Sequence, residues 1–321
     1  MLLQRCHLAT ACLICFLYLQ KSYGLEVHSE PILPIPQFEI TQPDLVTLGE
    51  KLFHDTRFSS DNSVSCASCH NLSKGGVDNK KLSLGVDNRK GEINTPTVFN
   101  SSLNIKQFWD GRAADLFDQI DGPVTNPKEM NAKWDDIVSV VENDTEYPSL
   151  FKASFSDGVT VDNIKLAITK FEESLLTPNS RFDRYLQGDD SAINNEELSG
   201  YILFKQYGCV SCHQGVAIGG NMFQKLGIMQ PYFTEDISPA DLGRFNVTNK
   251  EFDRFVFKVP SLRNIALTAP YLHDGSAESL EDVVQVMMFY QLGAEVSETD
   301  IALITSFLKT LTGEYKGQLL K

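Results

Sequence analysis

Five stretches of the chain combine apolar and polar positions in the pattern of helices. Strand signals are few, and long loops containing glycine, asparagine and proline separate the helical stretches. The predicted helices span 44–55, 162–176, 195–208, 279–292 and 297–311. The pattern therefore predicts a mainly α fold with long loops.

Two of these helices carry recognisable start signals. Asn194 or Asn195 can cap the third, and the fifth opens with Ser297 and Asp300 in a variant of the capping box. These signals fix where the third and fifth helices are expected to begin.

The N-terminal segment 1–24 has the pattern of a secretory signal. Arg5 precedes an apolar run from Leu8 to Leu19, and the small residues Ser22 and Gly24 follow. The run is about 12 residues long, which is short for a bilayer span. We therefore predict a cleaved signal peptide and a periplasmic protein, with a retained anchor as the alternative.

Two units of the form Cys-x-x-Cys-His dominate the chemistry of the chain. All cysteines outside 1–24 belong to them, so no thiol remains for a disulfide. The units are Cys66, Cys69 and His70, and then Cys209, Cys212 and His213. Paired thiols can bond to haem vinyl groups, and the adjacent histidine can bind iron. We predict two covalently bound c-type haems; a four-cysteine zinc site is the rival, but it needs no histidine after each pair.

The two haem units divide the chain. With 321 residues, 42% hydrophobic and 22% charged, the chain is long enough for two domains with cores of their own. A boundary near 177–185 separates the units, so we predict haem domains over 25–178 and 179–321, each like a small c-type cytochrome.

The second face of each iron decides the function, because an open iron binds small molecules and one with two protein ligands passes electrons. For the second haem the candidates are Met222, Met229, Met287 and Met288, since thioether ligation opposite histidine suits electron transfer. The helix pattern places Met287 on one face with two valines, which favours it slightly.

For the first haem no strong second ligand is present in the loop that follows the motif. The spare candidates are His28, His54, His273 and Met130, and each is more simply explained as a structural residue. The sequence therefore favours an open or water-bound first iron.

The formal net charge of −14 disfavours nucleic acid as a partner. It would steer a basic partner such as a small cytochrome, although solubility alone explains it equally well.

The sequence resembles the bacterial di-haem cytochrome c peroxidases over nearly all of the mature chain. Besides both haem motifs, the resemblance rests on "LGEKLFHDTRFS", "NTPTVFN", "QFWDGRAADL", "GPVTNPKEM", "TPNSRFDRYL", "FKVPSLRNIALTAPYLHDGS" and "VMMFYQLG". It implies a peroxidatic haem with His70 in the N-terminal half. It also implies an electron-transfer haem with His213 and Met287 in the C-terminal half.

The resemblance further implies three residues for the reaction. Glu129 matches the distal acid–base carboxylate, Gln119 the amide beside it, and Trp109 the tryptophan between the haems. One carboxylate can take a proton from the inner peroxide oxygen and give one to the leaving oxygen.

A calcium ion between the domains is also implied. Asn94 and the backbone carbonyls of Thr268 and Pro270 match its ligands. The family often forms dimers, which makes a homodimer the expectation.

The sequence departs from the resemblance in one place. Many members carry, in the loop after the first haem motif, a histidine that caps the iron until the other haem is reduced. Val86 stands there, and valine cannot bind iron. We therefore predict a first haem that needs no reductive activation.

Together these features predict an exported peroxidase that reduces hydrogen peroxide to water with electrons from a small cytochrome c or cupredoxin. The alternatives are a related di-haem enzyme that oxidises side chains of a partner protein, as in tryptophan tryptophylquinone formation, and a pure electron carrier. The former implies a tyrosine in place of Met287, and the latter implies two protein ligands on both irons.

Overall fold

The structure is a computed structural model that describes residues 30–321. The predicted signal at 1–24 and His28 lie outside the described residues. Pro31–Lys321 form one compact unit. Within 30–321, no helix has the length and apolar character that a membrane span needs.

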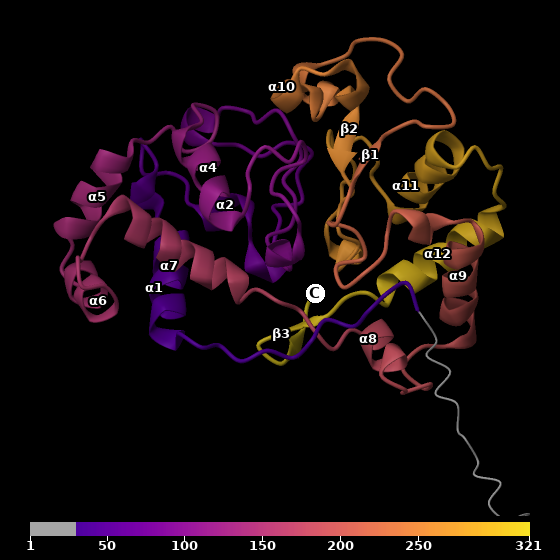
Figure 1. The fold of residues 1–321 in the computed structure, drawn as a ribbon, viewed down its shortest axis with the longest axis horizontal. Helices are drawn as coiled ribbons and strands as arrows, with labels where there is room; N and C mark the ends of the chain where they lie inside the picture. Colours follow the sequence, from indigo (N-terminus) through magenta and orange to yellow (C-terminus); the bar gives the residue numbers. More distant parts are fainter. Residues whose placement is uncertain (1–29) are drawn as a thin grey trace, which may run out of the picture. The chain divides into compact units, whose positions relative to one another are not determined.

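The fold is mainly α, as predicted (Figure 1). The helices before residue 180 are α1 Pro43–Phe53, α2 Cys66–Cys69, α3 Leu116–Gln119, α4 Asp121–Thr125, α5 Trp134–Glu142, α6 Tyr147–Ser154 and α7 Val161–Glu173. Those after it are α8 Arg181–Leu186, α9 Asn195–Gln206, α10 Phe245–Thr248, α11 Leu280–Val286 and α12 Glu298–Lys309.

The remaining regular structure is short. Antiparallel β1 Phe223–Lys225 and β2 Val256–Lys258 form one ribbon, with Phe223 opposite Lys258, and β3 Glu314–Tyr315 pairs with β4 Gln318–Leu319. Single 3₁₀ turns lie at Thr56–Phe58, Leu72–Lys74, Val86–Asn88, Ser101–Leu103, Cys209–Ser211, Pro239–Leu242, Glu251–Asp253 and Ile265–Leu267.

The predicted start of α9 is confirmed. At α12 the predicted cap Ser297 is confirmed, but the complete capping box is not. Asn194 and Glu197 form a complete capping box at the start of α9. At α12, the Ser297 side chain accepts from the Asp300 backbone N–H. The Asp300 carboxylate accepts from the Tyr207 hydroxyl at 2.5 Å, and the return bond that would complete the capping box is not present at α12.

The prediction of one continuous helix over 279–292 is wrong. α11 ends at Val286 and continues as a π-helical turn over Met287–Gln291. A π turn adds a residue to the helical period, which changes the direction in which the following side chains point.

Two hydrophobic cores fill the described chain. The first core is built from buried residues between Leu45 and Leu175, and in it α1 packs on α7. The second core is built mainly from residues between Phe182 and Leu311, and in it α9 packs on α12. Each end of the described chain packs with the opposite half: Ile32 belongs to the second core, and Tyr315 packs against the first. The division at 178/179 stays a prediction.

The packing of α9 on α12 depends on a close backbone approach. A Cβ atom at Gly200 would lie 1.9 Å from the backbone oxygen of Leu303. Only glycine permits this contact without a shift of one helix. Since α9 leads directly into the second motif, this crossing also positions that motif.

Candidate functional site

The second haem motif forms a single 3₁₀ turn directly after α9. The backbone N–H of His213 donates to the carbonyl of Cys209 at 2.9 Å. The ring Nδ1 of His213 lies 3.3 Å from the Ile218 carbonyl oxygen, to which it donates in the matching tautomer. Burial lowers the pKa of His213 to about 4, so the ring is neutral. This arrangement orients the imidazole and leaves Nε2 for a metal.

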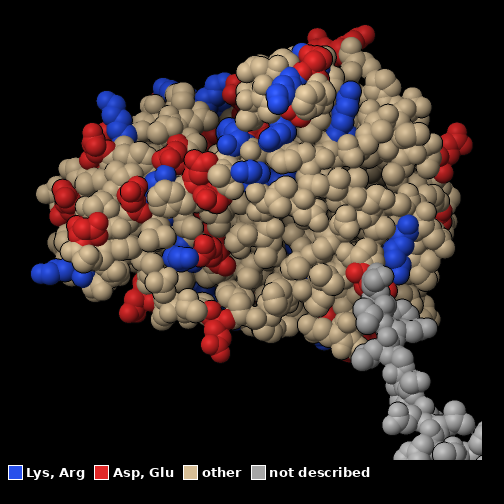
Figure 2. Space-filling model, in the orientation of Figure 1, with Lys and Arg blue, Asp and Glu red and all other residues tan. Residues whose placement is uncertain are grey.

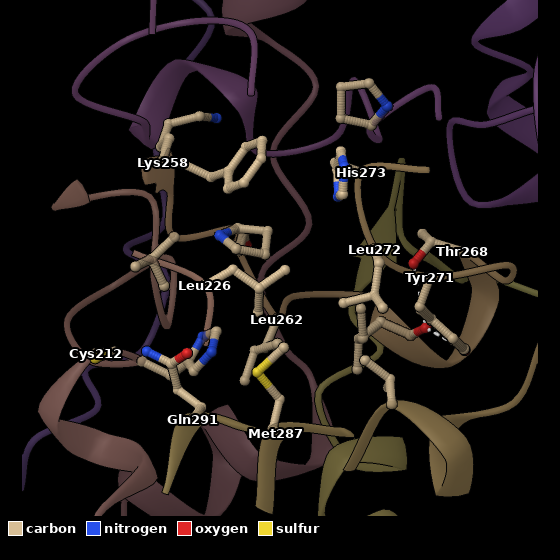
Figure 3. A pocket seen from close by; sticks show the side chains of 18 of the residues that line it. Cys212, Leu226, Lys258, Leu262, Thr268, Tyr271, Leu272, His273, Met287 and Gln291 are labelled. Carbon is tan, nitrogen blue, oxygen red and sulfur yellow. Dashed lines mark hydrogen bonds between the residues drawn. The ribbon is translucent and has the colours of Figure 1, made fainter. Parts of the chain in front are cut away.

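A largely apolar cavity opens at this motif (Figure 3). Cys209, Cys212, His213 and Met287 all line it, and the sulfur of Met287 points into it. The structure therefore brings together the predicted attachment and ligand residues of the second haem, although their roles stay predictions.

The other methionine candidates are placed less suitably. Met288 also lines the cavity but is only 1% exposed and belongs to the second core. Met229 is 56% exposed, and neither it nor Met222 lines the cavity. The geometry favours Met287.

The first motif repeats the same local design. α2 begins with a capping box at Ser65, and the backbone N–H of His70 donates to the Cys66 carbonyl at 2.9 Å. Nδ1 of His70 lies 3.3 Å from the carbonyl oxygen of Gly76. Burial raises the pKa of Cys66 to about 12 and that of Cys69 to about 11, so both thiols are neutral.

Glu129 lies beside the first motif. Its charge contributes to the raised pKa of both Cys66 and Cys69. Burial raises the pKa of Glu129 itself, and a hydrogen bond from Asn126 Nδ2 to Oε1, at 2.6 Å, and the charge of Arg112 oppose this rise. A carboxyl with a raised pKa holds a proton more readily than a free carboxyl, which suits a group that must both accept and release one.

The loop that carries Val86 is docked on the segment of Glu129. The Val86 N–H donates to the Glu129 backbone oxygen at 2.8 Å, and a Cβ at Gly85 would lie 2.5 Å from the same oxygen. Arg89 Nη1 donates to the Pro127 carbonyl at 3.0 Å. Val86 is 0% exposed. The loop is thus fixed beside the candidate acid–base group.

Gln119 is the last residue of α3 and is half-buried. In the described part of the chain its side chain makes no hydrogen bond with Glu129. The two residues are therefore not joined by a direct hydrogen bond, and the role of Gln119 stays a prediction.

Trp109 joins segments that are distant in the sequence. Its Nε1–H donates to the Asn94 backbone oxygen at 2.9 Å, and its own carbonyl accepts from the Lys258 N–H at 2.8 Å. The preceding Phe108 has φ +67°, a strained value for a bulky residue. Trp109 lines the same cavity as His213 and Met287.

The three predicted calcium ligands gather around the same cavity. Asn94, Thr268 and Pro270 all line it, and the Asn94 backbone N–H donates to the His273 carbonyl at 2.7 Å. Asn94 Nδ2 donates to the Lys80 carbonyl at 3.1 Å, which leaves Oδ1 available for a cation.

The spare histidines have structural partners. Nδ1 of His54 lies 2.8 Å from the Glu50 carbonyl oxygen. Nε2 of His273 lies 2.6 Å from Asp241 Oδ1, and His273 packs among aromatic rings. Met130 belongs to the first core.

Two buried charged groups were missed by the sequence reasoning. Lys258 lines the cavity, and Glu172 lies near Cys66, whose pKa it helps to raise. For Lys258 the available signal was a lone charged residue between apolar neighbours, in "VFKVP". Glu172, in "KFEES", stands between Phe171 and Glu173 and gave no such signal.

Comparison with known proteins identifies the family. Residues 43–191 match the family model described as di-haem cytochrome c peroxidase. The chain is 50% identical over 294 residues to the cytochrome c551 peroxidase of Nitrosomonas europaea, an alignment that covers 91% of this chain and 87% of the relative. This chain belongs to the di-haem cytochrome c peroxidase family. The predicted family and its enzyme class, cytochrome-c peroxidase, are confirmed.

Other members of the family are also similar. The cytochrome c peroxidase Ccp of Escherichia coli is 45% identical over 299 residues, which is 93% of this chain and 64% of that protein. Among solved structures, a MauG-like protein associated with microbial copper homeostasis superposes with a TM-score of 0.78 at 27% identity, covering 89% of this chain and 95% of the other.

The residues present fit the two haems that the family implies. Each motif supplies two thiols and one imidazole, and the cavity at the second motif adds a thioether and apolar walls. Iron held by His70, and by His213 with Met287, would supply the redox chemistry.

Proposed function

We propose that this family member is an exported peroxidase that reduces hydrogen peroxide to water without prior reductive activation. The observation that carries the activation part is Val86, which is buried in a loop docked beside Glu129 at the position where many relatives place a histidine. Valine offers no atom that could bind the iron at His70.

Glu129 is the acid–base group in this proposal. Its carboxylate takes the proton from the inner oxygen of peroxide and returns it to the leaving oxygen. Asn126, which donates to Oε1, holds the carboxylate in one orientation. The full reaction consumes two electrons and two protons and releases two molecules of water.

Trp109 is the residue through which the two halves exchange electrons. The second half, with His213 and Met287, accepts them from a small cytochrome c or a cupredoxin. The hydrogen bonds of Trp109 to Asn94 and Lys258 support this role, because they tie the indole and its backbone to both halves.

Three further parts of the proposal rest on sequence. Asn94, Thr268 and Pro270 bind calcium through oxygen atoms, which that ion prefers. The segment 1–24 directs export to the periplasm, and the active form is a homodimer.

The side-chain-oxidising alternative is less well supported. The resemblance places a tyrosine opposite the second histidine in such enzymes, and here Met287 points into the cavity. Substitution of Met287 should abolish the absorption of a methionine-bound haem.

Stopped-flow mixing of the fully oxidised protein with hydrogen peroxide tests the proposal. We expect a rapid change in the haem spectrum without any donor, and turnover once a reduced cytochrome c is added. The variant Val86→His should become low-spin and silent until reduced, whereas Leu84→His, at an exposed position of the same loop, should behave as wild type. Silence of the wild-type protein before reduction would overturn it.

A further inference from the structure

The cavity at the second motif has an unusual charge pattern. The charged side chains that line it are Lys225, Lys258 and Arg263, and no aspartate or glutamate lines it within the part of the chain that the structure describes. This contrasts with the net charge of −14 of the whole chain. The cavity therefore offers a positive environment inside an acidic protein.

Only one of the three cations is both buried and unpaired. Arg263 Nη1 donates to Asp183 Oδ1 at 2.6 Å. Lys225 is exposed and lies over the ring of Phe255. Lys258 is 8% exposed, and its Nζ has no hydrogen bond or ion pair in residues 30–321.

Two acids next to cavity-lining residues are already engaged. Asp241 pairs with His273, and Asp110 pairs with Arg112 at 3.0 Å. Burial without a counter-charge lowers the pKa of Lys258 to about 8. An ammonium held this way is costly unless an anion approaches it.

The backbone around Lys258 is fixed. Lys258 ends β2 opposite Phe223, and its N–H donates to the Trp109 carbonyl at 2.8 Å. Figure 3 shows its extended side chain at one end of the cavity and the Met287 sulfur at the other. A molecule that fills this cavity would therefore contact both Lys258 and Met287.

We infer that Lys258 binds a carboxylate substituent of the haem held in this cavity and raises the reduction potential of that haem. The inference rests on the proposed assignment of His213 and Met287 to the electron-transfer haem. A nearby cation favours the reduced state, because reduction removes one positive charge from the iron.

Redox titration of the holoprotein, followed by absorption, tests the inference. In Lys258→Met, the ratio of reduced to oxidised methionine-bound haem at a fixed potential should fall about tenfold, or about 59 mV for a one-electron couple. Lys258→Arg keeps the charge and should retain most of the wild-type potential. Lys250→Met, the matched control at an exposed lysine of the same half that does not line the cavity, should leave both potentials unchanged.

Unchanged potential of the methionine-bound haem in Lys258→Met, with full haem content, would overturn the inference. An equal shift in Lys250→Met would also overturn it, since the effect on the potential would then not depend on a cation inside the cavity. If Lys258→Met fails to retain haem, Lys258→Gln is titrated in its place with the same criterion. The titration uses no peroxide, so the inference and the proposed peroxidase activity can fail separately.

Discussion

Two glutamates in the first half, the half-buried Glu129 and the buried Glu172, differ in their surroundings, and this difference separates their expected behaviour. Glu129 accepts a hydrogen bond from Asn126 and faces the charge of Arg112. Glu172, on α7, is 7% exposed, and its Oε2 has no hydrogen-bond partner among the described residues. Glu129 is therefore suited to proton transfer, whereas Glu172 is expected to stay protonated in the folded protein at neutral pH.

Replacement of Glu129 should remove the acid–base step. For Glu129→Gln we expect kcat/KM for peroxide to fall by roughly 10²–10⁴, because an amide cannot exchange the proton. Steady-state turnover with reduced cytochrome c measures this. Glu142→Gln, at an exposed position of α5, is the control; equal activity of both variants would contradict the role of Glu129.

Glu172 should make the protein less stable at alkaline pH. Burial raises its pKa from 4.5 to about 8. The folded state then holds the proton more tightly than the unfolded state, so this contribution to stability is complete below the unfolded pKa and is lost as the pH rises through about 8.

Denaturant unfolding between about pH 5 and about pH 9 tests this. Glu172→Gln should flatten the fall in the free energy of unfolding across that range. Glu173→Gln, at the neighbouring and more exposed position paired with Lys170, should keep the wild-type profile. A parallel slope in the Glu172 variant would refute the explanation.

At the scale of elements, some helices are positioned by local caps and others by contacts with distant residues. α7 and α9 begin near the residues where the pattern predicts them, because their caps are local. The end of α11 is not set by a local cap. The helix changes there to a π turn that begins at Met287, which lines the cavity. The crossing of α9 and α12 depends on a single glycine.

Gly200→Ala should therefore destabilise the second half. An added Cβ would overlap the Leu303 backbone oxygen, and overpacking of this kind costs about 1–3 kcal/mol in the free energy of unfolding. Thermal or denaturant unfolding measures it. Ser199→Ala, on the exposed side of α9, should change stability by less than about 0.5 kcal/mol.

At the scale of the whole molecule, charge is distributed unevenly. The chain has a formal net charge of −14. On the face drawn in Figure 2, charged side chains are frequent over the half with α4 to α7, whereas the surface over α11 is mostly uncharged. The overall field should attract a basic donor, while the mostly uncharged part of this face offers contact area.

The rate with a basic cytochrome c should consequently fall with salt. Between about 0.01 M and about 0.1 M ionic strength the Debye length falls from about 30 Å to about 10 Å. We expect kcat/KM for the donor to decrease several-fold over this range while kcat changes little, as for electrostatically steered encounters. A rate that is independent of salt would show that the acidic surface serves solubility alone.

The sequence by itself determined the mainly α fold, the two haem motifs and the family. These follow from local patterns, because helix periodicity and the spacing of Cys-x-x-Cys-His involve residues close together in the chain. It also narrowed the second ligand to a few methionines and pointed to Val86 as a departure from relatives.

The tertiary structure decided what depends on distant contacts. Met287 and Met288 are neighbours in the chain, yet the Met287 sulfur points into the cavity and the Met288 side chain belongs to the second core. Successive side chains of a helix point in different directions, and only the tertiary packing decides which of them meets the cavity. Lys258 is buried without a counter-charge only because β2 and the segment of Trp109 meet. Burial and pairing arise from residues far apart in sequence, and a local pattern cannot specify them.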